Sequence, residues 1–363
     1  METHRRSLPP DDAALACYIC RMWNILTPMR LFSVATLTPA ALLGMAAIYG
    51  GWWILAAVLF LTVLTACLDE MVHHITPPTP EVEFPVAARL SILLGLAHFV
   101  VLALVVDALA NQSLGVFAKG GLFLSAGFFF GQVSNSNAHE LIHRGSRIVH
   151  RLGKWVYISL LFGHHTSAHV LVHHRHVATR EDPSTSRRGE SYYRFAVRAW
   201  RGSFRKGLTA ESARLRRINA PRYRHPYVSY ILGAIGFIVV AGLIGGIKGA
   251  LVYVALAGFA TSQLLLSDYV QHYGLMRRMI DGKPAPVDVR HSWNSPHWFS
   301  SAVMLNAPRH SDHHAHPQRP YDTLIIPDGS PMLPRSLPMM ATLALFPRRW
   351  RKVMDPLAAK WAA

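Results

Sequence analysis

The sequence predicts an all-α integral membrane protein with six transmembrane helices and a histidine-rich cap on the cytoplasmic side. Apolar runs of nearly twenty residues, the length that a helix needs to cross a bilayer, occur in three closely spaced pairs. The chain is 51% hydrophobic and 16% charged, yet its formal net charge is +17. Apolar and basic residues are therefore segregated along the 363 residues, as in a membrane protein whose loops hold the positive charge.

The three pairs of apolar runs predict three transmembrane hairpins. Gly50 and Gly51 separate the first two runs, and Gly245 and Gly246 separate the last two. Such short links leave no room for a folded domain between the two arms. The hairpins are expected at residues 31–68, 89–135 and 227–270.

The segments 136–226 and 271–363 are too polar to span a bilayer, and the first of them is rich in Lys and Arg. The positive-inside rule places them in the cytoplasm with the basic N-terminal flank, which lacks the apolar core of a signal peptide. Six crossings return both termini and every histidine cluster to this side. We expect one domain, 1–363, in a bacterial-type inner (plasma) membrane. Within it, residues 148–174 predict one helix lying at the membrane interface.

Histidines gather in the motifs HELIH, HVLVHH, QHYG and RHSDHHA. Residues four apart share one face of a helix, so His139 should pair with His143, and His169 with His173. The i, i+3, i+4 spacing of the last motif predicts three imidazoles on one face. Imidazole is the commonest neutral ligand of transition metals, and nine of them exceed the coordination sphere of one ion. The predicted ligands are His139, His143, His169, His173, His174, His272, His310, His313 and His314.

The motif HELIH alone also fits the zinc-protease signature HExxH. The seven other aligned histidines and the membrane setting argue against a protease. His73 and His74 fall in the proline-rich segment 69–88, which we expect to be a loop with non-ligating histidines. The C-x-x-C of Cys17 and Cys20 has no second pair and is weak evidence for metal or redox chemistry.

Carboxylates within the histidine motifs are expected beside the metal ligands, where they would orient the rings and offset the metal charge. The candidates are Glu140, Asp182, Asp268 and Asp312. Imidazole-rich sites with open positions suit iron, copper or zinc. A metal pair at the ends of apolar helices predicts redox chemistry on a hydrophobic molecule from the bilayer.

The motifs HELIHR, HVLVHH, VATREDPS, DYVQHYGL, SWNS and PRHSDHHAHPQRPY together resemble those of the membrane-bound diiron alkane 1-monooxygenases, in the fatty acid desaturase and hydroxylase superfamily. The resemblance covers nearly the whole chain. It implies that the nine histidines bind two iron ions, with no catalytic residue beyond these ligands. It further implies hydroxylation of an unactivated C–H bond with O₂, using electrons from rubredoxin or another iron–sulfur donor and its reductase.

Two positions depart from the alkane branch of this family. Ala168 and Gln271 stand where those enzymes usually carry glutamate, and with HELIHR they resemble the xylene monooxygenase branch instead. The substrate class therefore stays open between a linear alkane and an alkyl-aromatic. We expect oxidation of a terminal methyl group to a primary alcohol. A desaturase with the same diiron centre and a non-enzymatic membrane metal binder are the alternatives.

Three further predictions concern the glycines, the basic residues and the other histidines around the site. Glycines on the fourth apolar run should allow close helix packing, or else leave room for a long substrate. The basic cytoplasmic face should dock an acidic electron carrier at Arg187 and Arg188, and should otherwise contact membrane lipids rather than nucleic acid. The remaining histidines near the motifs are expected outside the ligand set: His164, His165, His176, His291, His297 and His316.

Overall fold

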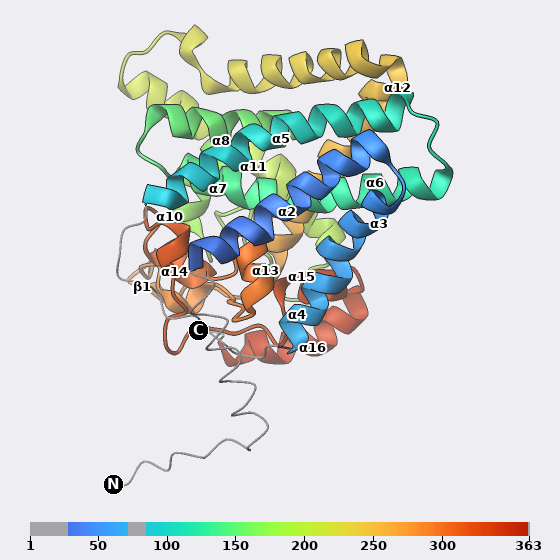
Figure 1. Cartoon of the computed structure of the whole chain (residues 1–363). Coiled ribbons are helices and arrows are strands. Elements are labelled where there is room, and N and C mark those ends of the chain that lie inside the picture. Colours follow the sequence, from blue (N-terminus) through green and yellow to red (C-terminus); the bar gives the residue numbers. More distant parts are fainter. Residues whose placement is uncertain (1–27, 72–84, 362–363) are drawn as a thin grey trace, which may run out of the picture.

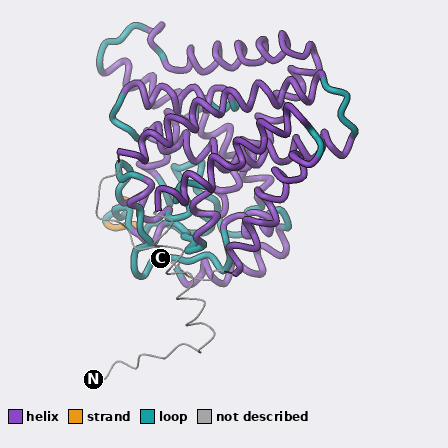
Figure 2. The backbone as a smooth tube through the Cα atoms, viewed as in Figure 1, coloured by secondary structure: helices purple, strands orange, loops and turns teal. Residues whose placement is uncertain are grey.

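The computed structural model describes residues 28–71 and 85–361, and their regular structure is almost entirely helical. Long helices lie side by side in one part of the molecule, and short red and orange helices form a cap at one end (Figure 1). The loops are concentrated within this cap (Figure 2). The predictions on Cys17, Cys20, His73 and His74 lie outside the described residues.

Five helices among the described residues are long and apolar enough to cross a bilayer, where the sequence predicts six separate spans. Two of the five helices are interrupted by a π-turn, which is labelled η1 in the first and η2 in the second. The five are α2 (Pro28–Tyr49), α3–η1–α4 (Trp52–Leu59, Phe60–Leu64, Thr65–Met71), α5 (Pro85–Asn111), α6–η2–α7 (Val116–Phe128, Phe129–Ser134, Asn135–Ile142) and α12 (Pro226–Gln271).

The difference in span number comes from α12, whose 46 residues comprise two helical arms joined at a kink. A straight helix of this length would be about 70 Å long, more than twice the hydrocarbon core of a bilayer. Gly245 and Gly246 leave helical geometry, and Gly246 has a φ of 60° that favours glycine. The rings of Phe237 and Tyr253 lie 6.5 Å apart on either side of this hinge. The helix therefore doubles back on itself.

Positive φ angles also shape the first hairpin. Gly50 and Gly51 have φ values of 62° and 55°, so the chain reverses between α2 and α3 within two residues. The following segment is helical through Met71, whereas the sequence predicts a loop from residue 69. Asp69 is consequently a buried side chain of α4 rather than a loop residue.

The cap and its connections consist of the long polar helix α11 and of shorter helices. The predicted interfacial helix 148–174 is wrong, because the chain turns between residues 160 and 164, with Leu161 at a φ of 55°. The helical elements are α8 (Arg147–Ser159), α9 (His165–Ala168), the π-turn η3 (His169–His173), α10 (His174–His176), α11 (Tyr192–Arg217), α13 (Trp298–Val303), α14 (His310–Ala315), α15 (Leu337–Ala344) and α16 (Pro347–Lys360). Three 3₁₀ turns, η4 (Arg222–Arg224), η5 (Val289–His291) and η6 (Tyr321–Thr323), and an antiparallel pair, β1 (Met279–Ile280) and β2 (Lys283–Pro284), complete it.

Close packing fixes the histidine-bearing helices against the long ones. Helix α7 packs on α8, where a Cβ added to Gly153 would lie 2.7 Å from Leu141. Helix α12 packs on α5 and η2, and α13 on α2 and α4. Buried apolar side chains from these elements form one continuous core that reaches the cap.

Candidate metal centre

The nine predicted histidines come together at the junction of the long helices and the cap. They form two groups, and within each group the candidate ligand atoms all lie within 4.8 Å of one another. The five-histidine group and the four-histidine group together contain every predicted ligand and no other residue. Their members are His139, His143, His169, His174 and His313 in the first, and His173, His272, His310 and His314 in the second.

The π-turn η3 determines how the second motif is divided between the groups. In a π-turn the hydrogen bonds join residues five apart, so the turn is wider than an α-turn. The Nε2 atoms of His169 and His174, five residues apart, are separated by 2.9 Å. His173 instead lies 3.2 Å from His314, Nε2 to Nε2, in the other group. The predicted pairing of His169 with His173 is therefore wrong.

Helix α14 also serves both groups. The Nε2 atoms of His310 and His314 lie 3.1 Å apart in the four-histidine group, as their i, i+4 spacing requires. The Nε2 atom of His313 lies 3.2 Å from that of His174, in the five-histidine group. The prediction of three imidazoles on one face is corrected to two on one face and one beside it. His139 and His143, by contrast, stay together as predicted.

The chemistry of this donor set fits metal ions. Neighbouring imidazole nitrogens about 2.1 Å from one ion are about 3 Å apart at right angles, and the closest Nε2 pairs lie 2.8 to 3.2 Å apart. Burial lowers the pKa of His143 to about 4 and that of His272 to about 3. These two rings are therefore neutral at pH 7, which is the state that binds a metal.

Only one of the four predicted carboxylates bonds a histidine of these groups, so far as the described residues show. The Oδ2 atom of Asp182 lies 2.8 Å from Nδ1 of His173. Asp182 also accepts hydrogen bonds from the Thr185 hydroxyl and the Ser184 amide, at 2.6 and 3.0 Å. Burial alone would lower the pKa of His173, but Asp182 raises it above its ordinary value. This contact fixes the ring with Nε2 facing the four-histidine group.

The other three predicted carboxylates form no hydrogen bond to a histidine of the two groups in the described part of the chain. Glu140 forms an ion pair with Arg144, one turn along the chain. Asp312 accepts two 2.7 Å hydrogen bonds from Arg319, and so braces the chain that follows α14. Asp268 is buried one turn before His272 and lines the cavity described below.

The additional histidines stand outside both groups, as expected. His165 comes closest, because its ring lies 5.0 Å from that of His169 and borders the same cavity. Others have hydrogen-bond partners elsewhere: His164 contacts Ser203 at 3.2 Å, and His297 contacts Ser295 at 2.9 Å. His291 and His316 bond to Asp288 and Asp312, and His176 is exposed.

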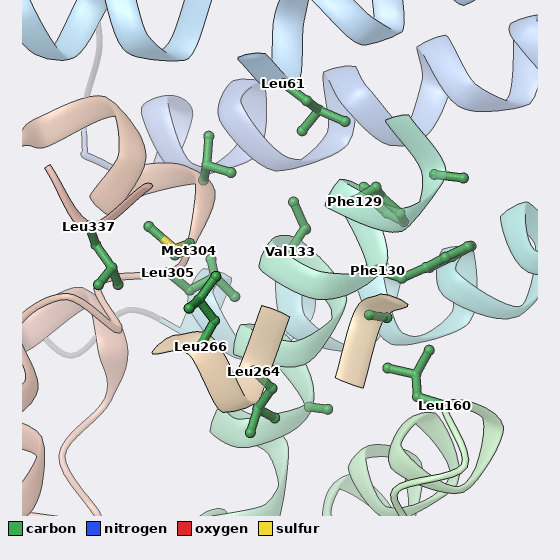
Figure 3. Close-up of a cluster of buried hydrophobic side chains, with 14 of the residues drawn as sticks. Leu61, Phe129, Phe130, Val133, Leu160, Leu264, Leu266, Met304, Leu305 and Leu337 are labelled. Atoms are coloured by element: carbon green, nitrogen blue, oxygen red, sulfur yellow. The ribbon is translucent and has the colours of Figure 1, made fainter. Parts of the chain in front are cut away.

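A cavity of about 470 Å³ borders both histidine groups. His139 and His169 of the five-histidine group and His310 of the four-histidine group form part of its wall. Most of the remaining wall is apolar. Leu61 of η1, Leu264 and Leu266 of α12, Met304 at the end of α13 and Leu337 of α15 line it. Figure 3 shows these five side chains within one cluster of buried apolar residues.

The glycines of the fourth apolar run serve helix packing. A Cβ on Gly127 would lie 2.1 Å from the Phe259 ring, and one on Gly131 would lie 2.6 Å from Gln263. These glycines therefore let α6 and η2 approach α12 closely. Gly120 has open space beside it, so it is not part of this contact.

The two positions that depart from the alkane branch are both buried. Ala168 packs against Gly207 of α11. Gln271 accepts a hydrogen bond from the Ser267 hydroxyl at 2.8 Å and donates one to the Ala307 carbonyl at 3.0 Å, at the edge of the cavity. Asp69 also lines this cavity, and sequence reasoning did not single it out. An acidic residue inside an apolar helix is the signal that could have found it.

A second hollow, of about 370 Å³, lies on the outer side of the four-histidine group. Arg180, Arg187 and Arg188 line it, and Arg187 and Arg188 are exposed. Asp182 also lines this hollow and contacts His173. Its side chain therefore lies between the basic hollow and the four-histidine group.

Comparison with known proteins identifies relatives of this architecture. The model of the fatty acid desaturase family matches residues 115–325. Alkane 1-monooxygenase 1 of Pseudomonas aeruginosa is 36% identical over 250 residues, covering 68% of this chain and 65% of the relative. Alkane 1-monooxygenase 2 of Alcanivorax borkumensis is 31% identical over 345 residues, covering 92% and 88%. The hydroxylase component of a xylene/toluene monooxygenase of Pseudomonas putida is 26% identical over 335 residues, covering 89% and 86%.

The matched stretch spans 65% of the first of these relatives, slightly less than two thirds of its length. The family match and the apolar helices make this a multi-pass membrane protein with a histidine-rich site suited to iron. The resemblance in the histidine motifs is thus confirmed: the chain belongs to the alkane 1-monooxygenase family, within the fatty acid desaturase family.

Proposed function

We propose that this protein is a membrane monooxygenase that hydroxylates the terminal methyl group of an apolar substrate, an alkane or an alkyl-aromatic, to a primary alcohol. The observation that carries the proposal is the apolar cavity whose wall includes members of both histidine groups. The names of the relatives favour the same chemistry. The reaction consumes the substrate, O₂, two electrons and two protons, and releases the alcohol and one water.

The two histidine groups would each hold one iron ion, and a bound iron pair supplies the means of reducing O₂. The protein's own part is to position the rings and to exclude water. Asp182 keeps His173 in one orientation, and the π-turn divides His169 and His173 between the groups. The apolar wall leaves a substrate few hydrogen-bonding partners near the histidines, so shape decides which carbon approaches them.

The geometry supports entry of the substrate from the bilayer. The cavity wall includes Leu124 and Leu345, which are 45% and 38% exposed on the outer surface of the molecule. A chain that enters between these residues would present its end to the histidines. A terminal methyl group is therefore the expected point of attack.

The electrons would come from rubredoxin or another acidic iron–sulfur protein, with its reductase. The hollow lined by Arg180, Arg187 and Arg188 supports this part of the proposal, because its positive charge complements an acidic carrier. The basic face and both termini would lie on the cytoplasmic side of a bacterial inner membrane, where such carriers are found.

Isotope labelling under ¹⁸O₂ tests the proposal directly. Purified protein with a reductant would be given medium-chain alkanes and methyl-substituted aromatics in parallel, with His173→Ala as the control. Labelled 1-alkanol or labelled benzylic alcohol from the wild type, and none from the variant, would support it and choose the substrate class. Unlabelled alkenes would identify a desaturase instead. A single zinc ion that survives both His173→Ala and His313→Ala, with no O₂ consumption, would leave only a metal-binding protein.

A further inference from the structure

Asp69 belongs to the cavity wall and has one carboxylate oxygen without a hydrogen-bond partner among the described residues. Its side chain is fully buried at the end of α4. The Oδ1 atom accepts hydrogen bonds from the amides of Phe299 and Ser300, at 3.2 and 3.0 Å, and so caps the start of α13. The Oδ2 atom has no hydrogen-bond partner among the described residues, and Asp69 forms part of the cavity wall. An unpaired buried acceptor costs free energy of folding, so a bound donor would stabilise this oxygen.

Ser336 presents a second unpaired group to the same cavity. It occupies the N-cap of α15, where a serine hydroxyl ordinarily accepts a hydrogen bond from the first turn, but it makes no such bond. The side chain is 1% exposed, and within the described part of the chain its hydroxyl has no partner. Its segment lies next to α4, because Arg335 and Glu70 form a 2.9 Å ion pair.

Other hydroxyls on this wall are already satisfied by their own helix. Thr62 donates to the Val58 carbonyl at 2.6 Å, and Thr65 donates to the Phe60 carbonyl at 2.9 Å. The unpaired groups at Asp69 and Ser336 therefore differ from these two threonines. A carboxylate oxygen accepts and a serine hydroxyl donates, and an alcohol group can satisfy both at once.

We propose that Asp69 and Ser336 form a subsite for a hydroxyl group at the far end of the substrate chain. The protein would then bind 1-alkanols as well as hydrocarbons, with the alcohol at this subsite and the methyl end at the histidines. This proposal rests on the proposed function. One turnover would convert the alkanol, O₂, two electrons from the iron–sulfur donor and two protons into an α,ω-diol and water.

Binding to the metal-free protein tests the subsite without relying on turnover. The rise in melting temperature caused by 1-decanol would be compared with that caused by decane, in wild type and in Asp69→Asn, each in the same detergent. The Asn side chain keeps one oxygen that can accept from the α13 amides. It places an NH₂ group, which donates, at the position where Oδ2 of Asp69 would accept from the alcohol. The preference for 1-decanol over decane, expressed as a ratio of apparent Kd values, should fall about tenfold in the variant.

Two serines provide a matched pair and cover the case in which Asp69→Asn does not fold. Ser336→Ala removes a hydroxyl that lines the cavity and should also lower the preference. Ser301→Ala removes an equally buried and unpaired hydroxyl that is not part of the wall, so it should leave the preference unchanged.

The outcomes separate this proposal from the proposed function. An unchanged preference in both Asp69→Asn and Ser336→Ala would overturn the subsite, even if decane is still hydroxylated. It would show that water alone occupies these groups. Diol formation from 1-decanol that falls in these variants, while decane hydroxylation stays within about twofold, would support it. Absence of hydroxylation with every substrate, together with an alkanol preference that depends on Asp69, would overturn the proposed function and leave a hydroxyl-binding site.

Discussion

The Nε2 atoms of His169 and His174 lie 2.9 Å apart because a π-turn, rather than an α-turn, joins them. The same turn directs His173 to the other group. One short element therefore supplies ligand candidates to both groups, and the two groups differ in size by one histidine.

This difference in size predicts that the two groups respond unequally to the loss of one ring. His173→Ala leaves three histidines in its group, whereas His174→Ala leaves four. We expect iron content to fall from about two to about one per chain in the first variant and to stay near two in the second. Metal analysis of protein prepared without oxygen measures this. Equal losses in the two variants would mean that the groups do not bind metal separately.

Removing the carboxylate that holds His173 should weaken metal binding without removing a ligand. Asp182→Asn loses the charge that orients the ring, and such changes typically cost 10- to 100-fold in metal affinity, roughly. Competition with a chelator gives the affinity. Glu181→Gln is the matched control, because Glu181 is exposed and pairs with Lys206. Affinities that are the same in both variants would show that Asp182 is dispensable.

Packing at Gly127 should tolerate no added methyl group. Gly127→Ala would place a Cβ against the Phe259 ring, and overpacking of this kind destabilises by about 1 to 3 kcal/mol. Gly120→Ala, on the same helix, adds its methyl group to open space and should change stability little. Thermal unfolding in detergent measures both. Should Gly127→Ala melt at the wild-type temperature, α6 and α12 do not depend on close contact at this point.

Charge reversal at the basic hollow should weaken docking of the electron donor. We expect Arg187→Glu with Arg188→Glu to raise the apparent KM for an acidic iron–sulfur donor several-fold, with little change in kcat. Added salt should reduce the difference, since it screens exposed charges. Steady-state turnover against donor concentration tests this, with Arg222→Glu and Arg224→Glu as exposed controls. If all variants give the same KM, the positive charge at the hollow does not guide the donor.

The histidine motifs predicted which residues converge, because their number and chemistry allow few other uses. They could not predict the division between groups, since the α-helical period assigns His173 to His169 and a π-turn cannot be read from HVLVHH. The bend in α12 could be predicted from its glycines. Gly245 and Gly246 leave helical geometry, so α12 bends where the sequence predicts the turn of the last hairpin.

Carboxylates were harder to place than histidines. Asp182 lies only nine residues from its partner His173, in the loop that follows α10, and was predicted correctly. Glu140 and Asp312 sit inside motifs but pair with Arg144 and Arg319, whose positions depend on tertiary packing. Asp69 was missed because it contacts α13, about 230 residues further along the chain, and no local pattern records that contact.

The six-residue helix α14 gives His310 and His314 to one group and His313 to the other. The pitch of a single helical turn thus decides how these three histidines divide between the two groups. Insertions or substitutions in the long apolar helices can reshape the cavity while this spacing stays constant. Changes to the cavity can therefore leave the division of these three histidines between the groups unchanged.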